Sequence, residues 1–388
     1  MTTNLFEPPR RTLLRDLLSD AVLPLISAWA VAVTITSVIR LVANGMRQDF
    51  AWFYWSSIAL LKGRPMYQYP NLNPPHFAFV TLPFTAAPLG WALAAWAATM
   101  VICLTVSSVI VSRELHWRPT VRDVCMMAAS APIALALATG QNTWILVLGM
   151  TLGWRALRHN RQTEAGIWFA LVTSIKPFLW PLGLWFILRR MWRPLTAWII
   201  TGAVVLSAGI AICGAQAYRD WFTTGGFVAW YEDQWNVSIL GLASRLARTG
   251  RVPVHNMPLL VACLTVLGAI GLLALSLWRR RAPDVELGPV ILAACLASPL
   301  AEVYYVALAL GPVIARLRKK LPAWSPILLL FLWSAGSTWL SNNAPVWTIP
   351  LRSRFFIATV ALWMICLDDG SRQAGGPAGD RRRLRQAG

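Results

Sequence analysis

Apolar segments, most of them close to the length that crosses a bilayer, alternate with polar gaps along almost the whole chain. A membrane-spanning helix needs about 20 consecutive apolar residues, and fewer where other parts of the protein shield it. On this pattern the sequence predicts about twelve spanning helices. They are expected at residues 21–43, 88–112, 123–139, 143–157, 164–175, 178–189, 195–214, 257–278, 286–299, 300–315, 323–340 and 349–367. The predicted fold class is therefore an all-α, polytopic membrane protein.

The segments outside these helices divide the chain into three parts. Residues 1–20 are basic and precede an apolar segment without a small-residue cleavage site. We therefore expect a cytoplasmic N-terminal segment and a retained helix rather than a signal peptide. Residues 21–367 are expected to form a single membrane domain. The Gly- and Arg-rich residues 368–388 predict a disordered cytoplasmic tail.

Two of the polar gaps, near residues 44–87 and 215–256, are much longer than the rest. In the first, residues 50–61 are rich in Trp, Tyr and Phe, which favour the membrane–water interface, so a short interfacial helix is expected there. Other gaps are almost absent, as around 139–142 and 175–178. Backbone breaks at membrane depth are tolerated only inside protein or beside a wet cavity, so these turns are candidate parts of a site.

Composition and charge narrow the class of protein. Hydrophobic residues make up 57% of the 388 and charged residues only 13%, against about 25% in a soluble domain, which excludes a soluble enzyme. The net charge of +19 first suggests a nucleic-acid partner, but about two-thirds of the Lys and Arg residues fall in alternate gaps and in the tail. By the positive-inside rule these gaps are cytoplasmic. We expect a multi-pass protein of the inner (plasma) membrane with both termini cytoplasmic and no nucleic-acid partner.

The cysteines and acids do not indicate a metal. The six cysteines lie in or beside apolar segments and show neither a CxxC nor a Cys/His spacing. Neither a disulfide framework nor a zinc site is supported by that spacing. The acidic residues form no cluster typical of a metal cage. We therefore expect no metal and no cofactor.

Two ionisable residues at the predicted outer edge are candidates for chemistry. Asp49 follows the first spanning helix and precedes the interfacial helix. It is either the N-cap of that helix or a general base whose pKa is raised by desolvation, and the two roles are compatible. Lys176 lies between two apolar segments in a turn with almost no other loop residue. It is either a snorkelling lysine or a point charge for a phosphate group.

The second long external segment places Trp beside carboxylates and amides, around Glu232, Trp235 and Asn236. Aromatic rings stack on the C–H faces of sugars while polar groups bind the hydroxyls, so a sugar site is one interpretation. An interfacial aromatic belt explains the Trp residues equally well. The turn at residues 140–142 is likewise either a simple hairpin or part of a site.

Several short motifs follow one another in an order that resembles glycosyltransferase family 87. The motifs are Asp49-Phe50 with Tyr54, Gly63 to Tyr67, Pro74-Pro75 with Pro83, Gly140-Gln141-Asn142, Lys176-Pro177, Asn236-Val237-Ser238 with Arg245, and Ser298-Pro299. Each motif is weak alone, but all lie at a predicted outer edge and together they cover roughly residues 20–320. The resemblance implies a GT-C architecture and a polyprenyl-phosphate-sugar-dependent transferase, a class that includes mannosyltransferases.

The resemblance also implies roles for the matched positions. Asp49 resembles the catalytic base, and Lys176 and Arg245 are expected to bind the donor phosphate. The substrate-binding residues expected are Tyr54, Tyr67, Gln141, Asn142, Asn236, Ser238, Glu302 and Tyr304. Members of the family often carry a His shortly after the Ser-Pro step, where this chain has Glu302 and Tyr304. The role of that His is therefore not carried over.

The implied function is transfer of a hexose, with mannose as the first candidate, from a polyprenyl-phosphate sugar. The acceptor is expected to be a lipid-linked or cell-envelope glycan on the extracytoplasmic face, and transfer is expected to invert the anomeric carbon. Donor, acceptor and membrane lipid are then the partners. Two other classes stay open: a secondary transporter or lipid flippase, which internal repeats favour although we find none, and a scaffold for polysaccharide assembly.

Overall fold

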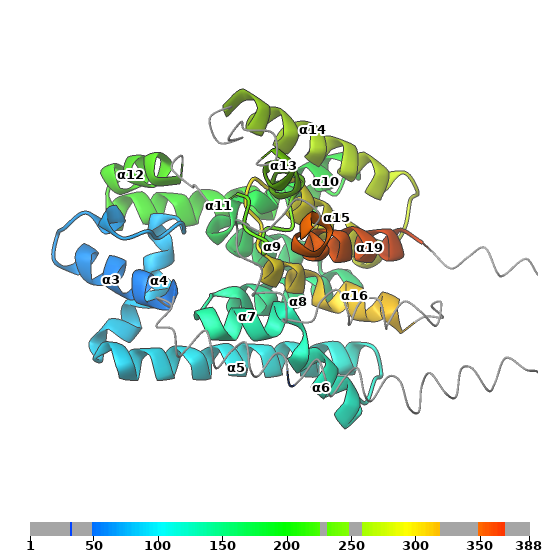
Figure 1. Cartoon of the computed structure of the whole chain (residues 1–388), viewed down its shortest axis with the longest axis horizontal. Coiled ribbons are helices and arrows are strands. Elements are labelled where there is room, and N and C mark those ends of the chain that lie inside the picture. The colour runs from blue at the N-terminus through cyan, green and yellow to red at the C-terminus, as the bar shows by residue number, and fades with distance from the viewer. Residues whose placement is uncertain (1–31, 33–48, 226–230, 248–257, 319–347, 369–388) are drawn as a thin grey trace, which may run out of the picture.

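The computed structural model describes residue 32 and residues 49–225, 231–247, 258–318 and 348–368 (Figure 1). In this part of the chain every named element is a helix, and a β-bridge joins Asn236 to Glu302. The predicted all-α class is therefore confirmed. The spans predicted at 21–43 and 323–340 lie outside the described residues, apart from residue 32.

Helices follow one another with short links. The α-helices are α3 (Asp49–Leu61), α4 (Ala78–Thr81), α5 (Leu89–Glu114), α6 (Val121–Ala129), α7 (Ala131–Thr139), α8 (Thr143–Arg158), α9 (Gln162–Ile175), α10 (Pro181–Leu188), α11 (Trp192–Cys213), α12 (Ala215–Gly225), α13 (Ile239–Ala247), α14 (Pro258–Leu277), α15 (Pro283–Ala297), α16 (Leu310–Leu317), α18 (Ile349–Arg352) and α19 (Arg354–Leu367). The 3₁₀ helices are η2 (Met66–Gln68), η3 (Pro75–Phe77), η4 (Leu82–Ala86), η5 (Pro177–Leu179) and η8 (Val303–Ala309).

Two described helices, α5 and α11, are long and apolar enough to cross a membrane. Most of their surface faces away from the packed interior, as expected of helices that contact lipid. Shorter apolar helices lie at residues 177–188, 263–277, 303–317 and 354–367. The number of twelve spans stays a prediction, because α5 and α11 are the two helices of the described residues that qualify by length and composition.

Two predicted spans are each divided in two. The segment 123–139 forms α6 and α7, which are separated at Ser130, because Pro132 at the start of α7 excludes an uninterrupted helix. The segment 300–315 forms η8 and α16, and residues 298–302 form a non-helical link before η8. The helix predicted at 50–61 is present as α3. The second of these breaks matters for the site, because the 298–302 link contains Glu302.

Helices α8 and α9 lie at the centre of the core, between α5 and α11. Small residues allow close approach between apolar helices. A methyl group added at Gly153 would lie within 2.3 Å of the ring of Phe169, and one at Gly166 within 2.3 Å of the backbone of Pro194. Helices α8, α9 and α11 therefore approach each other so closely that Gly153 and Gly166 cannot be replaced by residues with a side chain without a shift of their neighbours.

The basic gaps of the sequence meet at one end of the structure. Arg318 donates to the carbonyl of Leu115, and Arg189 donates to the carbonyls of Leu277 and Arg279. Near the end of α19, the carbonyl of Cys366 accepts a hydrogen bond from Arg281, and that of Ile365 accepts one from Arg316. The five gaps that follow α5, α8, α10, α14 and α16 thus lie together, as one cytoplasmic face requires. Which side of the membrane this end occupies stays a prediction.

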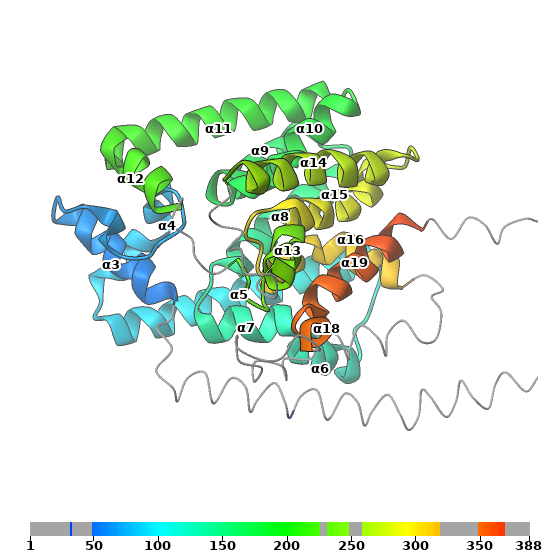
Figure 2. The same ribbon diagram turned by 45° about the horizontal axis from the view of Figure 1, so that its top comes forward.

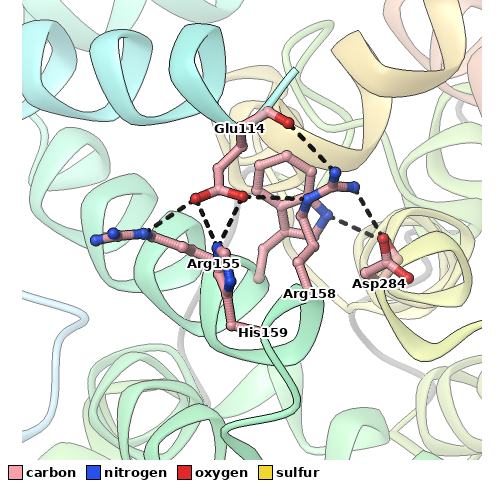
Figure 3. A network of polar contacts seen from close by, with 6 residues as sticks. Glu114, Arg155, Arg158, His159 and Asp284 are labelled. Atoms are coloured by element: carbon pink, nitrogen blue, oxygen red, sulfur yellow. Dashed lines mark hydrogen bonds and ion pairs between the residues drawn. The ribbon is translucent and has the colours of Figure 1, made fainter. Parts of the chain in front are cut away.

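A polar network ties three helices together at this end (Figure 3). Glu114 at the end of α5 accepts hydrogen bonds from Arg155 and Arg158 and lies 3.0 Å from the ring of His159. Arg158 also forms an ion pair of 3.0 Å with Asp284 at the start of α15. One carboxylate therefore joins the ends of α5 and α8, and Arg158 extends the network to α15.

Glu114→Gln is expected to lower the free energy of unfolding by about 1–2 kcal/mol, because its hydrogen bonds are to charged but partly exposed partners. Thermal unfolding in detergent at low and high salt measures this, and the difference from wild type should shrink at high salt. Glu164→Gln is the matched control, since Glu164 forms only an exposed pair with Arg161. An equal loss in both variants would contradict a special role for the network.

The opposite end of the molecule carries the elements that the sequence predicts to be external. Helices α3, α4 and α12 lie together there in both views, at the left of Figures 1 and 2, and the described end of α19 lies at the right. His76 links η3 and α9 to this group. Its ring contacts the hydroxyl of Tyr218 in α12 and the carbonyl of Ser174 in α9, both at 2.9 Å. The two long external segments predicted from the sequence are thus packed against each other.

Candidate active site

Asp49 is the first residue of α3, and its carboxylate is bound by Gln141. Gln141 follows Gly140, which ends α7 in the left-handed region at a φ of +70°. A glycine suits this conformation because it has no Cβ. The indole of Trp96 donates to the carbonyl of Gly140 at 2.9 Å and fixes the turn. The tight turn seen in the sequence therefore directs an amide to the candidate base.

Lys176 lies between α9 and η5, where Pro177 begins a new helical turn. Its ammonium nitrogen is 4.8 Å from the centre of the Tyr305 ring. Asp49 and Glu302 both act electrostatically on this ammonium. The structure thus brings together one cation and two carboxylates from three distant parts of the chain, with Gln141 bound to one of them.

Burial shifts the ionisation of both groups. Desolvation raises the pKa of Asp49 to about 6, against the opposing effects of the Gln141 hydrogen bond and the Lys176 charge. Desolvation also lowers the pKa of Lys176 to about 8, against the opposing effects of Glu302 and Asp49. Near neutral pH the carboxylate of Asp49 is therefore ionised but remains a much better proton acceptor than an exposed aspartate.

Asn236 binds residues 298–302, the non-helical link that contains Glu302. The two residues form an antiparallel β-bridge, flanked by backbone hydrogen bonds of 2.8 Å from Val237 to Ala301 and from Val303 to Trp235. The side-chain oxygen of Asn236 also accepts a hydrogen bond from the Ala301 amide at 3.3 Å. Asn236 is completely buried. Its role in the structure is thus to hold the 298–302 link beside the second external segment.

Tyr304 follows Glu302 by two residues in the chain. Its side chain is buried and interacts with the Glu302 carboxylate. Its ring packs edge-on against Tyr305 with 4.7 Å between the ring centres. The two positions where the chain departs from the family pattern, Glu302 and Tyr304, therefore interact with each other.

Arg245 is held by the second external segment. Its Nε donates to the hydroxyl of Ser353 at 2.9 Å, and its Nη1 donates to the carbonyls of Asp233 and Asn236 at 2.7 and 3.1 Å. Its Nη2 is buried and has no hydrogen-bond partner. These contacts do not include Asp49 or Lys176, so the structure does not bring the two predicted phosphate-binding residues into contact.

The other predicted substrate-binding side chains mostly hold loops. Tyr54 donates to the carbonyl of Ala87 at 2.9 Å, and Tyr67 donates to that of Asn73 at 2.7 Å. The Oγ of Ser238 accepts from the Gly241 amide at 2.9 Å.

The two amides of the 140–142 turn retain bonding capacity. Asn142 donates from its side-chain nitrogen to the Asn73 side chain at 3.1 Å, while Gln141 donates to Asp49. The oxygen of each amide is buried and has no hydrogen-bond partner. Buried polar atoms in proteins are nearly always bonded, so these two acceptors, one of them on the side chain that binds Asp49, retain the capacity to accept a hydroxyl donor.

Tyr305 and Asn73 also belong to this region, although neither was among the predicted site residues. Tyr305 contacts Lys176 through its ring, and Asn73 joins Tyr67 to Asn142. The position of Tyr305 next to the unusual acid Glu302 and Tyr304 was the available signal. Asn73 offered none, because its partner Asn142 is far away in sequence.

Metal ligands do not gather in the described residues. Among residues 49–225, 231–247, 258–318 and 348–368, no three His, Cys, Asp or Glu side chains lie close enough to hold a metal ion. The positive charge that the described contacts place beside Asp49 is that of Lys176.

Apolar helices with a carboxylate, an amide and a lysine gathered from separate elements define a membrane protein with a polar site. The model of glycosyltransferase family 87 matches residues 71–299, which is more than half of the chain. The chain therefore belongs to glycosyltransferase family 87, as the motifs predicted, and is a membrane glycosyltransferase. No curated protein and no solved structure matches it. Asp49 and Glu302 lie outside the matched residues, and Gln141, Lys176 and Arg245 lie within them.

Proposed function

We propose that the protein transfers a hexose, with mannose as the first candidate, from a polyprenyl-phosphate sugar to a lipid-linked or cell-envelope glycan. Transfer takes place on the extracytoplasmic face of the inner membrane, in a GT-C architecture, and inverts the anomeric carbon. The observation that carries the proposal is the Asp49 carboxylate, which is bound by Gln141 and lies within electrostatic reach of Lys176. A base beside a single cation suits attack by a hydroxyl on a phosphate-linked sugar.

In this reaction Asp49 takes the proton of the acceptor hydroxyl as that oxygen bonds to the anomeric carbon. The bond from the anomeric carbon to the phosphate oxygen breaks, and its electron pair leaves with the polyprenyl phosphate. Lys176 stabilises the charge that develops on the leaving phosphate, which is the kind of contribution that is usually largest in enzymes. The free Nη2 of Arg245 is the proposed second contact for the donor phosphate.

The remaining polar groups are proposed to bind the two sugars. The unpaired amide oxygens of Gln141 and Asn142 accept hydrogen bonds from hydroxyls beside the base. Glu302, which interacts with Tyr304 and with the charge of Lys176, is proposed to bind further sugar hydroxyls. Tyr54, Tyr67, Asn236 and Ser238 act mainly by holding the loops that carry these groups.

A lipid-linked donor fits the surface that leads to the site. Helix α11 exposes apolar side chains along its length, among them Ile199, Val204, Ile210 and Ile212. It ends at the external group of helices that contains α12 (Figure 2). An isoprenoid chain can lie against such a surface within the bilayer while its phosphate reaches the polar end of the helices.

The test is transfer by the purified full-length protein in proteoliposomes. We expect radiolabelled hexose to move from a polyprenyl-phosphate hexose to a cell-envelope glycolipid extract, and no transfer from the corresponding nucleotide sugar. A panel of hexoses on the same lipid identifies the sugar. Transfer from nucleotide sugars alone would overturn the donor assignment. Movement of the labelled lipid across the bilayer without a new product would instead indicate a transporter or flippase.

A further inference from the structure

Tyr305 has no part in the reaction described above, yet its ring is fixed on several sides. The ring centre is 5.3 Å from that of Phe178 and 4.7 Å from that of Tyr304. The side chain is only 5% exposed. The ring over which the Lys176 ammonium lies is therefore a rigid surface.

The ammonium of Lys176 has two competing acids nearby. Asp49 and Glu302 both act on it electrostatically, but among the described residues neither carboxylate lies within the 4 Å of an ion pair with it. The ammonium lies over the Tyr305 ring instead, 4.8 Å from the ring centre. The cation is thus held near both acids without being paired to either.

A lysine at such a site tends to form an ion pair with a nearby carboxylate, and the contact with the ring opposes this. Its ammonium is a compact charge on a flexible four-carbon stem, so a nearby carboxylate tends to capture it. A direct pair with Asp49 would weaken the base and occupy the cation before the donor binds. The face of an aromatic ring attracts a cation without adding negative charge.

We propose that Tyr305 is a positioning residue that holds the Lys176 ammonium over its ring face, out of ion pairs with Asp49 and Glu302 and available to the phosphate of the donor. The inference rests on the proposed function in one respect, which is that Lys176 binds this phosphate. The hydroxyl of Tyr305 is not required by it, because the attraction comes from the ring.

Binding and kinetics of Tyr305→Leu and Tyr305→Phe separate the ring from the hydroxyl. The probes are a polyprenyl phosphate without sugar, for binding in detergent micelles, and the active polyprenyl-phosphate hexose, for rates. We expect Tyr305→Leu to raise the Kd for polyprenyl phosphate and the KM for the donor about tenfold, with a smaller change in the KM for the acceptor. Tyr305→Phe should stay within about twofold of wild type, since it retains the ring. Equal losses in both variants would overturn the proposal.

A second series keeps the test decisive if Tyr305→Leu does not fold. Ring fluorination of the Tyr305→Phe variant, with zero to three fluorines, weakens the attraction of the ring face for a cation while it nearly preserves shape. Affinity for polyprenyl phosphate should fall stepwise by about tenfold over the series. A flat series would overturn the positioning role. If wild-type protein binds no polyprenyl phosphate at all, the proposed function fails instead, and the two failures are distinguishable.

Discussion

Asp49→Asn is expected to reduce sugar transfer by about 10²–10⁴-fold while the protein folds and binds its donor normally. Asparagine has the same shape and can still bond to Gln141, but it cannot accept the proton of the acceptor hydroxyl. The measurement is the initial rate of transfer in proteoliposomes, together with donor binding and thermal unfolding in detergent. Asp220→Asn is the matched control, because Asp220 is another acid of an external segment and contacts Gln216 instead. Activity of Asp49→Asn within about tenfold of wild type would remove Asp49 from the role of base.

The same assignment sets the acidic limb of the pH profile. Burial raises the pKa of Asp49 to about 6, and only the ionised carboxylate accepts a proton. The rate is therefore expected to fall as pH drops through about 6. The Gln141 hydrogen bond lowers this pKa, so Gln141→Leu should shift the limb to higher pH. A limb that stays in place in Gln141→Leu would contradict the coupling between this amide and the base.

Lys176→Met is expected to lower kcat/KM for the donor by about 10²–10³-fold, because it removes the cation proposed to stabilise the leaving phosphate. It also removes a positive charge that lowers the pKa of Asp49. The acidic limb of the rate should therefore move to higher pH in this variant. In wild type, burial lowers the pKa of Lys176 to about 8. Donor affinity is thus expected to weaken as pH rises through about 8, when the ammonium loses its proton.

Lys62→Met is the matched control for this substitution. Lys62 is an exposed lysine just after α3, so its loss changes net charge equally without touching the site. Donor binding and the pH–rate profile of both variants are measured side by side. An unchanged donor Kd in Lys176→Met, or an equal loss in Lys62→Met, would contradict a specific phosphate contact at Lys176.

The bounds of the long helices were accessible from the sequence because they depend on local features. Helices α5 and α11 begin and end within about three residues of the predicted spans 88–112 and 195–214. Apolar runs closed by Arg or Gly carry this information directly. The break at Ser130 between α6 and α7 was missed, because apolar residues continue across it. A hydropathy pattern does not report the conformation of a single residue.

The residues of the candidate site likewise differ in whether local features of the sequence reveal them. Asp49 and Lys176 were recognised because a charged side chain at the edge of an apolar segment is conspicuous. The contact of Lys176 with Tyr305 was not predictable, since the two residues meet only when α9 and η8 are placed beside each other. The position of Arg245, bonded to Ser353 rather than to groups beside Lys176, was equally inaccessible.

The sequence by itself determined the class of protein, the sorting of basic residues to alternate gaps and the family, because each is written in composition or in short motifs. Only the tertiary structure decided which polar side chains share a site. Asp49, Gln141, Lys176 and Glu302 come from four separate segments. Their meeting depends on how apolar helices pack, and close packing is set by shape and volume along the whole interface rather than by any local pattern.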